Sequence, residues 1–482
     1  MKKLLACMLT LAMVASLFVG CSGNDAPASS QPSTPAASSD GGSEGGNEGG
    51  SGASDLNGKS LNIFGCLSQK EHEYDGWKSV AEKFKEDYGV TVNYTIKGQW
   101  DEIPNNMTAA KLSGEQYDIV HTGVGLVLSS LAPAGICMDL TQLLDPIKDR
   151  WNDGVLDTTT AGDKIWSMPV LDTGSSCIYV NQDMMEELGI AEFKTYDDML
   201  AAAKTIADKK NIMPMIHQGK AVSMWPMWFF EIYGQTTGDP VGEITKFLSG
   251  DTKFADAPDA VESFELLRKF IDDGILTTAS LDTDRDGMIA VFLQQKAAMF
   301  YGGTWEYDAV KNGAEFNWTV WEFPQVVDGA ALKHGGGPNG ALIIPSFCDK
   351  ENVGTTAQYI EYFTRPENNQ IVMDQVSPLM ACMKNVECID EPQSQKLNKQ
   401  FVPNTSAFLD WIWPVKVNDS FAQVIPAVMN GSMTAAEATQ NVQAIYDTLV
   451  KEEDYSYNWY DKFDDEMWAQ VTFESIPSYE VK

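Results

Sequence analysis

The chain has 482 residues, of which 44% are hydrophobic, and its 34 Lys and Arg against 68 Asp and Glu give a formal net charge of −34 at pH 7. This charge argues against DNA, RNA or another polyanion as ligand, and against a body that lies on an anionic membrane, because such contacts need a surplus of basic side chains. The length exceeds what one hydrophobic core usually organises, so we expect two domains.

The first 20 residues are typical of a secretory signal. Lys2 and Lys3 precede an apolar stretch over residues 4–19, which at about 16 residues is shorter than the ~20 that a membrane-spanning helix needs. The sequence Phe18-Val19-Gly20-Cys21 resembles the bacterial lipobox, which implies cleavage before Cys21 and lipidation of that cysteine. An ordinary signal peptide cut after Gly20 or later is the alternative.

Residues 21–55 are predicted to be a flexible tether. They are rich in Ser, Gly, Ala and Pro and contain almost no large apolar side chain, so they cannot bury enough surface to fold. About 33 such residues span roughly 30 Å. We therefore expect a folded body held by lipid at the extracellular face of the cell membrane.

The folded body begins with alternating strand and helix patterns. Residues 60–67 read as a buried strand, 75–89 as an amphipathic helix that stops at a glycine, 90–98 as a strand, 103–115 as a helix, and 117–123 as a short buried strand. The order β-α-β-α-β predicts an α/β fold in which helices flank a sheet.

Further elements follow along the chain. Residues 211–218 and 341–347 are strand-like, and residues 195–210, 259–274 and 434–451 have helical periodicity. Thr and an acidic residue three positions later predict capping boxes at the start of the first and last of these helices.

Residues 450–482 are acidic and aromatic. Because apolar rings are costly to leave in water, we expect this tail to pack against the body or to cover one end of a cleft.

Six of the eight cysteines remain after Cys7, in the signal, and Cys21. The favoured interpretation is buried thiols that behave as small hydrophobic side chains. A local disulfide between Cys382 and Cys388 is the alternative, since secretion permits it. The six are Cys66, Cys137, Cys177, Cys348, Cys382 and Cys388.

Catalytic motifs find little support. The Gly335-x-Gly337-x-x-Gly340 spacing precedes a strand and includes a proline, whereas a dinucleotide-binding loop opens a helix. The four histidines form no zinc motif, and the sequence has no Gly-x-Ser-x-Gly elbow. A carboxylate pair for glycoside cleavage can be neither chosen nor excluded. No cofactor is expected.

Asp282, Asp284 and Asp286, followed by Gly287, match the opening of a calcium loop, but the twelfth position is Leu293 instead of Glu. Aspartates at the start of a helix are also expected without any metal. We favour the helix cap and keep calcium as the weaker alternative.

Four stretches resemble the extracellular solute-binding proteins of ABC importers, in the family that includes maltose-binding protein. These are "AAKLSGEQYDIVHTG", "LAPAGICMDLTQLL", "GDKIWSMPVLDTGSSCIYVNQDMMEELGI" and "QQKAAMFYGGTWEY". Their order and spacing span most of residues 59–450. In the third, Asn181 and Asp183 read as structural residues that cap the following helix. In the fourth, Lys296 follows Gln295 where the family usually has Gly.

The resemblance implies an α/β fold of two lobes, like the periplasmic binding proteins, with hinge strands and an inter-lobe cleft. It implies lobe 1 over residues 56–172, lobe 2 over 173–322, a return to lobe 1 over 323–385, and lobe-2 helices with the acidic aromatic tail over 386–482.

It also implies a sugar or oligosaccharide ligand, bound by aromatic stacking and polar hydrogen bonds. Trp305 is the preferred ring, because Gly302 and Gly303 would let backbone approach a ligand closely; its alternative is a core position. Only one of Trp411 and Trp413 would face the cleft. The other ring candidates are Trp100, which follows the second strand, and Trp225 and Trp228, which are expected in a loop after a strand and have a core position as their alternative. The polar candidates are Glu71, His72, His121, Thr122 and Asp172, and a structural role is the alternative for His121.

The implied mechanism is closure of two lobes on a ligand that is then delivered, unaltered, to membrane permease subunits. We expect a monomer that is not an enzyme and binds no nucleic acid. The alternatives are the same fold with a peptide or polyamine as ligand, and, with less support, a secreted carbohydrate-active enzyme.

Overall fold

The structure is a computed structural model that describes residues 56–66, 73–220, 224–376, 380–388, 390–401, 405–472 and 479–482. The predicted signal peptide, the predicted lipidation site Cys21, the predicted tether, Glu71 and His72 lie outside the described residues. Over the described ranges, no helix is both long enough and apolar enough to cross a membrane.

Lobe 1 is built on a five-stranded sheet with the strand order β2-β1-β3-β12-β6. Strand β1 runs parallel to β2 and β3, whereas β12 is antiparallel to β3 and β6, which confirms the β-α-β-α-β prediction. The strands are β1 (Ser60–Gly65), β2 (Thr91–Ile96), β3 (Ile119–Gly123), β6 (Met168–Pro169) and β12 (Gly340–Ile343), and a separate hairpin joins β4 (Thr160–Ala161) to β5 (Lys164–Ile165).

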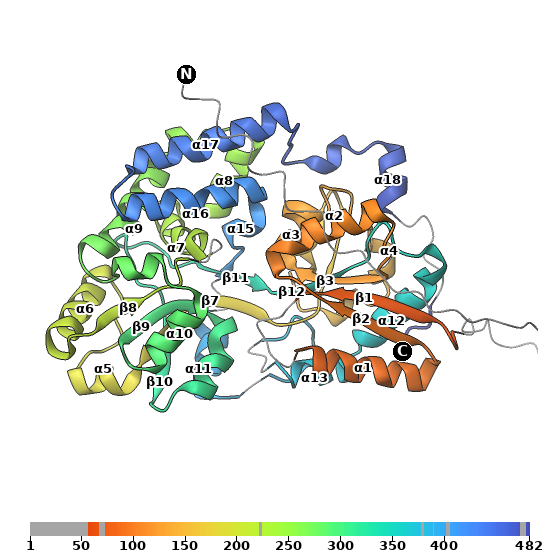
Figure 1. Ribbon diagram of the computed structural model, residues 1–482, viewed down its shortest axis with the longest axis horizontal. Coiled ribbons are helices and arrows are strands. Elements are labelled where there is room, and N and C mark those ends of the chain that lie inside the picture. The colour runs from red at the N-terminus through yellow and green to blue at the C-terminus, as the bar shows by residue number, and fades with distance from the viewer. Residues whose placement is uncertain are drawn as a thin grey trace, which may run out of the picture. The chain divides into compact units, whose positions relative to one another are not determined.

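Helices flank this sheet (Figure 1). Helix α1 buries Trp77, Val80 and Phe84 on one face and ends before Gly89, whose φ of 71° is a conformation that suits glycine. Trp77 packs on Phe363, with 5.0 Å between ring centroids. The helices of lobe 1 are α1 (Glu73–Tyr88), α2 (Ile103–Ser113), α3 (Val124–Leu126), α4 (Thr141–Leu144), α12 (Val353–Phe363), α13 (Pro366–Met373) and α18 (Asp465–Val471).

Lobe 2 is built on a six-stranded sheet around β7, all nine residues of which are buried. β7 is antiparallel to β9, β10 and β11, and β8 is parallel to β9. The strands are β7 (Thr173–Asn181), β8 (Met213–Ile216), β9 (Ala297–Gly303), β10 (Trp318–Trp321), β11 (His334–Pro338) and β13 (Thr405–Ser406).

The helices of lobe 2 include two that begin with the predicted capping boxes, at Thr195 and Thr434. Asn181 caps α5 by accepting from the amide of Met184. The helices are α5 (Gln182–Leu188), α6 (Tyr196–Lys210), α7 (Met224–Thr237), α8 (Pro240–Ser249), α9 (Pro258–Asp272), α10 (Arg285–Leu293), α11 (Tyr307–Gly313), α14 (Pro392–Lys396), α15 (Leu409–Ile412), α16 (Val415–Met429) and α17 (Ala435–Glu452).

The two sheets are joined by chain segments that lie side by side, which we call the hinge. The amide of Asn339 donates to the carbonyl of Asp172 at 3.0 Å, and its side-chain Nδ2 donates to Asp172 Oδ1 at 3.0 Å. The amide of Cys382 donates to Leu171 O at 2.8 Å. Because β11 belongs to the lobe-2 sheet, the chain re-enters lobe 1 at Asn339, later than the boundary at residue 323 that the resemblance implied.

The cysteines lie in apolar surroundings. Five of the six are buried and Cys388 is half-buried. None of these six, all of which are described, is in a disulfide. The alternative of a Cys382–Cys388 bond is therefore wrong for this structure, in which Cys388 Sγ accepts from the amide of Ala381 at 3.2 Å.

Candidate functional site

Trp100 lies at the end of the lobe-1 sheet and is half-buried. It begins a short 3-10 helix, Trp100–Glu102, that follows β2. A Cβ added to Gly123, at the end of β3, would lie 3.2 Å from Cε3 of Trp100. The indole therefore rests on glycine backbone, and one side of it meets the edge of the His121 ring, with 5.0 Å between centroids.

Trp411, on α15 of lobe 2, lies close to α3 of lobe 1. A Cβ added to Gly125 of α3 would lie 2.0 Å from Cδ1 of Trp411, and one added to Gly337 of β11 would lie 2.7 Å from Cζ3. Both sites must be glycine for the indole to fit, because real Cβ contacts are never so short. The ring of Trp411, which belongs to lobe 2, therefore packs on the backbone of lobe 1.

Trp305 extends the aromatic surface into lobe 2. Its ring meets Phe408 at 5.9 Å between centroids, and Phe408 meets Trp411 at 5.2 Å. A Cβ on Gly303 would lie 2.2 Å from Cη2 of Trp305. Gly302 and Gly303 were predicted to let backbone approach a ligand closely. In this conformation that approach is closed at Gly303, because the indole of Trp305 itself covers the face of Gly303.

We call four side chains the aromatic row: Trp411, Phe408 and Trp305, whose rings are in contact, and Trp100, whose ring lies on Gly123, two residues before the Gly125 backbone that Trp411 covers. Its members come from both lobes, and its Trp members are half-buried while Phe408 is 3% exposed. Flat rings of this kind bind apolar ring faces at a low cost in side-chain entropy. Sequence reasoning missed Phe408, although it lies only three residues before the candidate Trp411.

A buried acid lies beside the row. Glu306, which follows Trp305, is completely buried, and its Oε2 pairs with Arg285 at 2.7 Å. Its Oε1 accepts from Gln218 Nε2 at 3.4 Å. Burial raises the pKa of Glu306, and Arg285 offsets part of that rise. Neither Glu306 nor its partners were singled out from the sequence, although Glu306 adjoins the preferred ring.

His121 lies beneath the row and has no exposed surface. Its Nδ1 is 2.8 Å from the hydroxyl of Tyr74, and its Nε2 is 3.3 Å from Glu73 Oε1. Burial lowers the pKa of His121 to about 3, so the ring is neutral at pH 7. In this conformation His121 offers no surface to a ligand. Its role here is structural, because its ring packs against the indole of Trp100.

Thr122 and Asp172 are also fully buried. The hydroxyl of Thr122 reaches the carbonyl of Gly123 at 3.5 Å, and Asp172 bonds to Asn339 in the hinge. Neither side chain offers surface to a ligand in this conformation, because each is enclosed by its own strand and its neighbours.

Trp225, Trp228 and Trp413 belong to the lobe-2 core, with exposures of 0%, 0% and 1%. The sequence placed the first two in a loop after a strand, but they lie on α7. Trp225 Nε1 donates to Gly219 O at 2.7 Å, and Trp228 Nε1 donates to His217 Nδ1 at 3.1 Å. In this conformation their rings have no face open to a ligand, and Trp411 is the one of the 411/413 pair that reaches the row.

One of the three aspartates at 282–286 caps a helix. Asp284 Oδ1 accepts from the amide of Gly287 at 2.9 Å, at the start of α10, which confirms the favoured cap interpretation for Asp284. Among the residues that the structure describes, no group of three His, Cys, Asp or Glu side chains could hold a metal ion.

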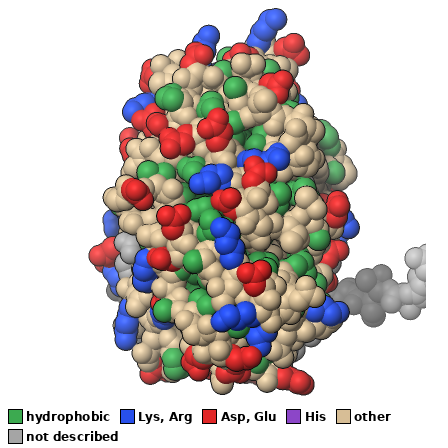
Figure 2. Space-filling view, turned by 90° about the vertical axis from the view of Figure 1, so that its left-hand side faces the viewer, with side chains coloured by type: hydrophobic (Ala, Val, Ile, Leu, Met, Phe, Trp, Pro, Cys, Tyr) green, Lys and Arg blue, Asp and Glu red, His purple; other side chains and the backbone are tan. Residues whose placement is uncertain are grey.

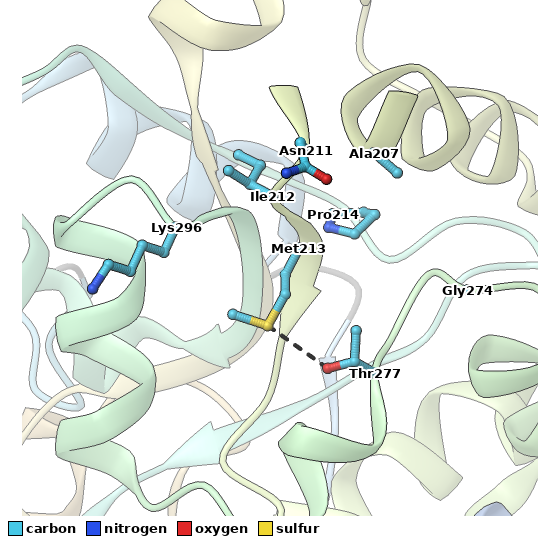
Figure 3. A pocket seen from close by; sticks show the side chains of 8 residues that line it. All are labelled: Ala207, Asn211, Ile212, Met213, Pro214, Gly274, Thr277 and Lys296. Atoms are coloured by element: carbon cyan, nitrogen blue, oxygen red, sulfur yellow. Dashed lines mark hydrogen bonds between the residues drawn. The ribbon is translucent and has the colours of Figure 1, made fainter. Parts of the chain in front are cut away.

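A shallow depression of about 510 Å³ lies elsewhere on lobe 2 (Figure 3). It is found where β8 begins, at Met213, whereas ligands of open α/β sheets bind beyond the carboxyl ends of strands. On the face of lobe 2 shown in Figure 2, acidic and basic side chains are interspersed with hydrophobic ones. Because it lies at the amino-terminal end of β8, the depression is a weaker candidate than the aromatic row. It is lined by Ala207, Asn211, Ile212, Met213, Pro214, Gly274, Thr277 and Lys296.

Comparison with known proteins decides the family. The sequence profile of bacterial extracellular solute-binding proteins matches residues 79–400. The chain belongs to this family. A protein of Brucella abortus (strain 2308) that is named as a binding protein is 23% identical over 243 residues, which is 49% of this chain and 56% of that relative. The chain thus spans little more than half the length of the curated relatives it matches.

Solved structures share the fold of this family member. A chitin oligosaccharide binding protein superposes with a TM-score of 0.70 at 21% identity, covering 80% of this chain and 98% of the other. The solute-binding protein RafE, in complex with raffinose, gives 0.66 at 18% identity, with 81% and 99% covered. The GacH receptor of Streptomyces glaucescens, studied with acarbose, gives 0.66 at 20%, with 82% and 99% covered.

Proposed function

We propose that this solute-binding protein is the membrane-tethered substrate-binding component of an ABC importer, and that it binds a sugar or oligosaccharide between its lobes. The observation that carries the proposal is the aromatic row, to which lobe 1 contributes Trp100 and lobe 2 contributes Trp305, Phe408 and Trp411. Sugars present an apolar C–H face and a rim of hydroxyl groups, and stacked indoles match that face.

The mechanism is closure of the lobes without chemistry. A sugar ring that stacks on Trp411 takes the place of the Gly125 backbone, so the ligand itself becomes the contact between the lobes. Arg285, which pairs with the buried Glu306 next to Trp305 and keeps part of its side chain exposed, receives the hydroxyl rim. Affinities near micromolar correspond to about −8 kcal/mol, which a few buried rings and hydrogen bonds can supply.

The lipid and the partners form the rest of the proposal. Cys21 carries the lipid that holds the protein at the extracellular face of the cell membrane, and residues up to 55 act as the tether. The monomeric body then delivers its ligand to the permease subunits. Proteins of similar fold that bind raffinose or chitin oligosaccharides support a sugar as ligand.

A thermal-shift panel tests the ligand class. Ligands that bind only the native state raise the melting temperature, by an amount that grows with their concentration over Kd. Chitotriose, raffinose, stachyose and xylotriose form one arm, and spermidine and a tripeptide form the other. We expect a rise with at least one sugar, and loss of that rise in Trp411→Ala. A rise with spermidine or the tripeptide alone would reject a sugar ligand, and release of new reducing ends would make the protein an enzyme.

A further inference from the structure

The C-terminal strap, which we define as the described residues 453–472 and 479–482, begins on lobe 2 and ends on lobe 1. It follows α17 and lies beyond the part of the chain that matches the family profile. Figure 1 shows it leaving α17 and forming α18. Its first part packs on lobe 2, where the amide of Tyr455 donates to Leu449 O at 3.2 Å and its ring lies 6.0 Å from that of Tyr446. Tyr457 also packs against the lobe-2 core.

The next aromatic residue of the strap belongs to the other lobe. Trp459 is 8% exposed and sits in a lobe-1 core cluster, with 5.1 Å between its ring centroid and that of Trp166. Trp468 stacks on Trp166 at 5.6 Å and 20°. The Nζ of Lys164 lies 4.8 Å from the Trp468 ring centroid, a cation–π contact. Main-chain bonding secures the same region, because the amide of Asp139 donates to Val471 O at 2.8 Å.

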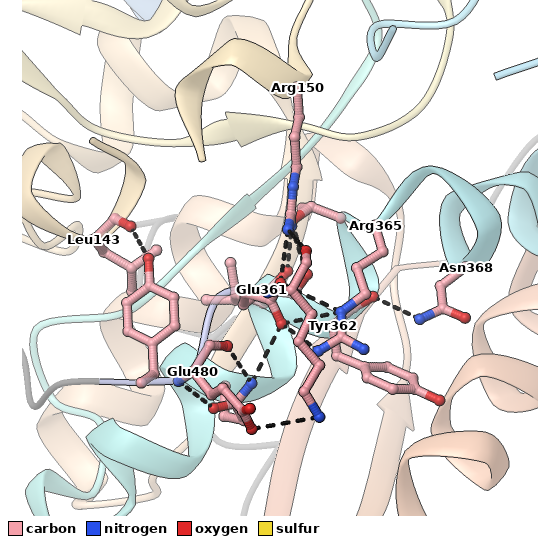
Figure 4. A network of polar contacts seen from close by, with 12 residues as sticks. Leu143, Arg150, Glu361, Tyr362, Arg365, Asn368 and Glu480 are labelled. Atoms are coloured by element: carbon pink, nitrogen blue, oxygen red, sulfur yellow. Dashed lines mark hydrogen bonds and ion pairs between the residues drawn. The ribbon is translucent and has the colours of Figure 1, made fainter. Parts of the chain in front are cut away.

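A second anchor holds the last residues of the strap on lobe 1 (Figure 4). The amide of Glu480 donates to Gln358 Oε1 at 2.9 Å, and Gln358 Nε2 donates back to the Glu480 carbonyl at 3.0 Å. The amide of Lys482 donates to Glu361 Oε1 at 3.1 Å, and Arg150 donates to the Lys482 carbonyl at 2.8 Å. The hydroxyl of Tyr479 also donates to the carbonyl of Leu143.

The crossing between the lobes is therefore very short. Tyr457 packs on lobe 2 and Trp459 on lobe 1, and two extended residues reach at most about 7 Å. Asn458, which lies between them, is exposed. If the lobes separate at this point by more than the crossing can reach, either the tyrosines or Trp459 must leave their sites.

We infer that the C-terminal strap is a latch that limits how far the two lobes open. It acts separately from the hinge, which consists of other segments of the chain. The latch favours the conformation in which both aromatic anchors are seated, and it thereby raises the fraction of molecules whose lobes are close together. Its effect on ligand affinity rests on the proposed function, but its effect on the distance between the lobes does not.

The test adds slack and leaves both anchors in place. Six Gly and Ser residues are inserted between Tyr457 and Asn458 of the full chain, and the matched control carries the same insert between Asp251 and Thr252, which are exposed residues within lobe 2. Nitroxide labels at Leu112 of α2 and Ile445 of α17, which are 83% and 39% exposed, report the inter-lobe distance by dipolar spectroscopy. Labelling uses a chemistry other than thiol coupling, because the body contains six cysteines.

We expect the insertion at 457 to broaden the distance distribution and shift it to longer values, while the control matches the parent protein. Hydrogen exchange at the amide of Asp139 should stay slow in all three proteins, which shows that the strap is still docked. An unchanged distribution with a docked strap would overturn the latch.

Affinity provides the second readout, measured with a sugar that raises the melting temperature in the panel. Because apparent Kd scales inversely with the competent fraction, a tenfold fall in that fraction raises Kd about tenfold. If no sugar binds but the distance distribution still broadens, the proposed function fails and the latch stands.

Discussion

The indole of Trp411 in lobe 2 lies directly on the backbone of Gly125 in lobe 1, so closely that a Cβ at position 125 would be 2.0 Å from Cδ1 of the indole. A Cβ at position 337, two residues before the hinge residue Asn339, would lie 2.7 Å from Cζ3 of the same ring. The contact between the lobes thus requires the indole of Trp411 and also requires that positions 125 and 337 carry no side chain.

Gly125→Ala should disturb this contact. The added methyl group must displace the indole or the helix, and overpacking of this kind costs about 1–3 kcal/mol. The free energy of unfolding by urea measures the cost. Gly234→Ala in α7 is the matched control, since its Cβ would meet only ordinary contacts at 3.7 Å and alanine favours a helix interior. Equal stability of the two variants would contradict the tight packing at Gly125.

Trp411→Ala and Trp413→Ala should affect different properties of the protein: the first should weaken sugar binding and the second should lower stability. Trp411 is half-buried in the aromatic row, so its loss should abolish the thermal shift given by a sugar while costing little stability. Trp413 is 1% exposed in the lobe-2 core, and truncation of such a residue costs about 3–5 kcal/mol. Thermal unfolding of both variants, with and without the sugar, checks the pair. A stability loss in Trp411→Ala as large as that in Trp413→Ala would contradict the assignment.

The stability of the protein should fall between pH 6.5 and 9 because of His334. Its Nδ1 is 3.4 Å from Glu231 and its Nε2 is 3.4 Å from Glu322, with the ring of Phe401 beside it. Burial opposes a charge here, but the hydrogen bonds to both acids outweigh it and raise the pKa of His334 to about 9 from 6.5. Below pH 6.5 the stabilisation is complete, on the order of 3 kcal/mol. As the pH rises towards 9 it is lost, because the unfolded chain releases this proton first.

His334→Gln provides the comparison for that profile. The variant should be less stable than the parent protein at pH 6, and the difference should shrink as the pH approaches 9. Urea midpoints at half-unit intervals of pH measure it. A difference between the two proteins that does not change with pH would show that His334 carries no charge in the folded state.

Glu361→Ala should destabilise lobe 1 strongly. Glu361 is fully buried and pairs with Arg150 at 2.6 Å and with Arg365 at 2.7 Å. Burial opposes its charge, but the two arginines prevail and lower the pKa of Glu361. Loss of the carboxylate leaves two largely buried cations without their partner, which costs about 3–5 kcal/mol.

Glu243→Ala is the matched control for that change. Its pair with Lys246 lies at the surface, where such contacts contribute about 0–1 kcal/mol. Chemical denaturation of both variants checks the contrast. If Glu361→Ala costs no more than Glu243→Ala, the network of Figure 4 is not a stabilising one.

Local patterns predicted much of the fold. The strands at 60–65, 91–96 and 119–123 and the capping boxes at Thr195 and Thr434 follow from periodicity and side-chain capping, which act over a few residues. The Trp residues on α7 were placed wrongly, because "MWPMWFF" is apolar on every side and so has no helical stripe to detect.

The candidate site was harder to predict, because it depends on contacts between distant segments. Nothing near Trp100 in the sequence indicates that Gly123 lies under its ring, or that His121 is enclosed beneath it. Phe408, which directly precedes α15, joins the row only because the fold brings it to Trp305. Sequence reasoning identified the aromatic residue type correctly, but only tertiary packing separates Trp411 from Trp413.

The packing of residues 459–472 and 479–482 on lobe 1 has a consequence for the order in which the protein matures. Lobe 2 draws its core from residues between 178 and 449, so every part of that core is synthesised before the last segments of lobe 1. The first lobe in sequence is thus the last to be completed, since Trp166 must wait for Trp459 and Trp468 to arrive. Contacts over such long separations form slowly. During synthesis and export, the N-terminal half therefore remains without its final partners until the end of the chain emerges.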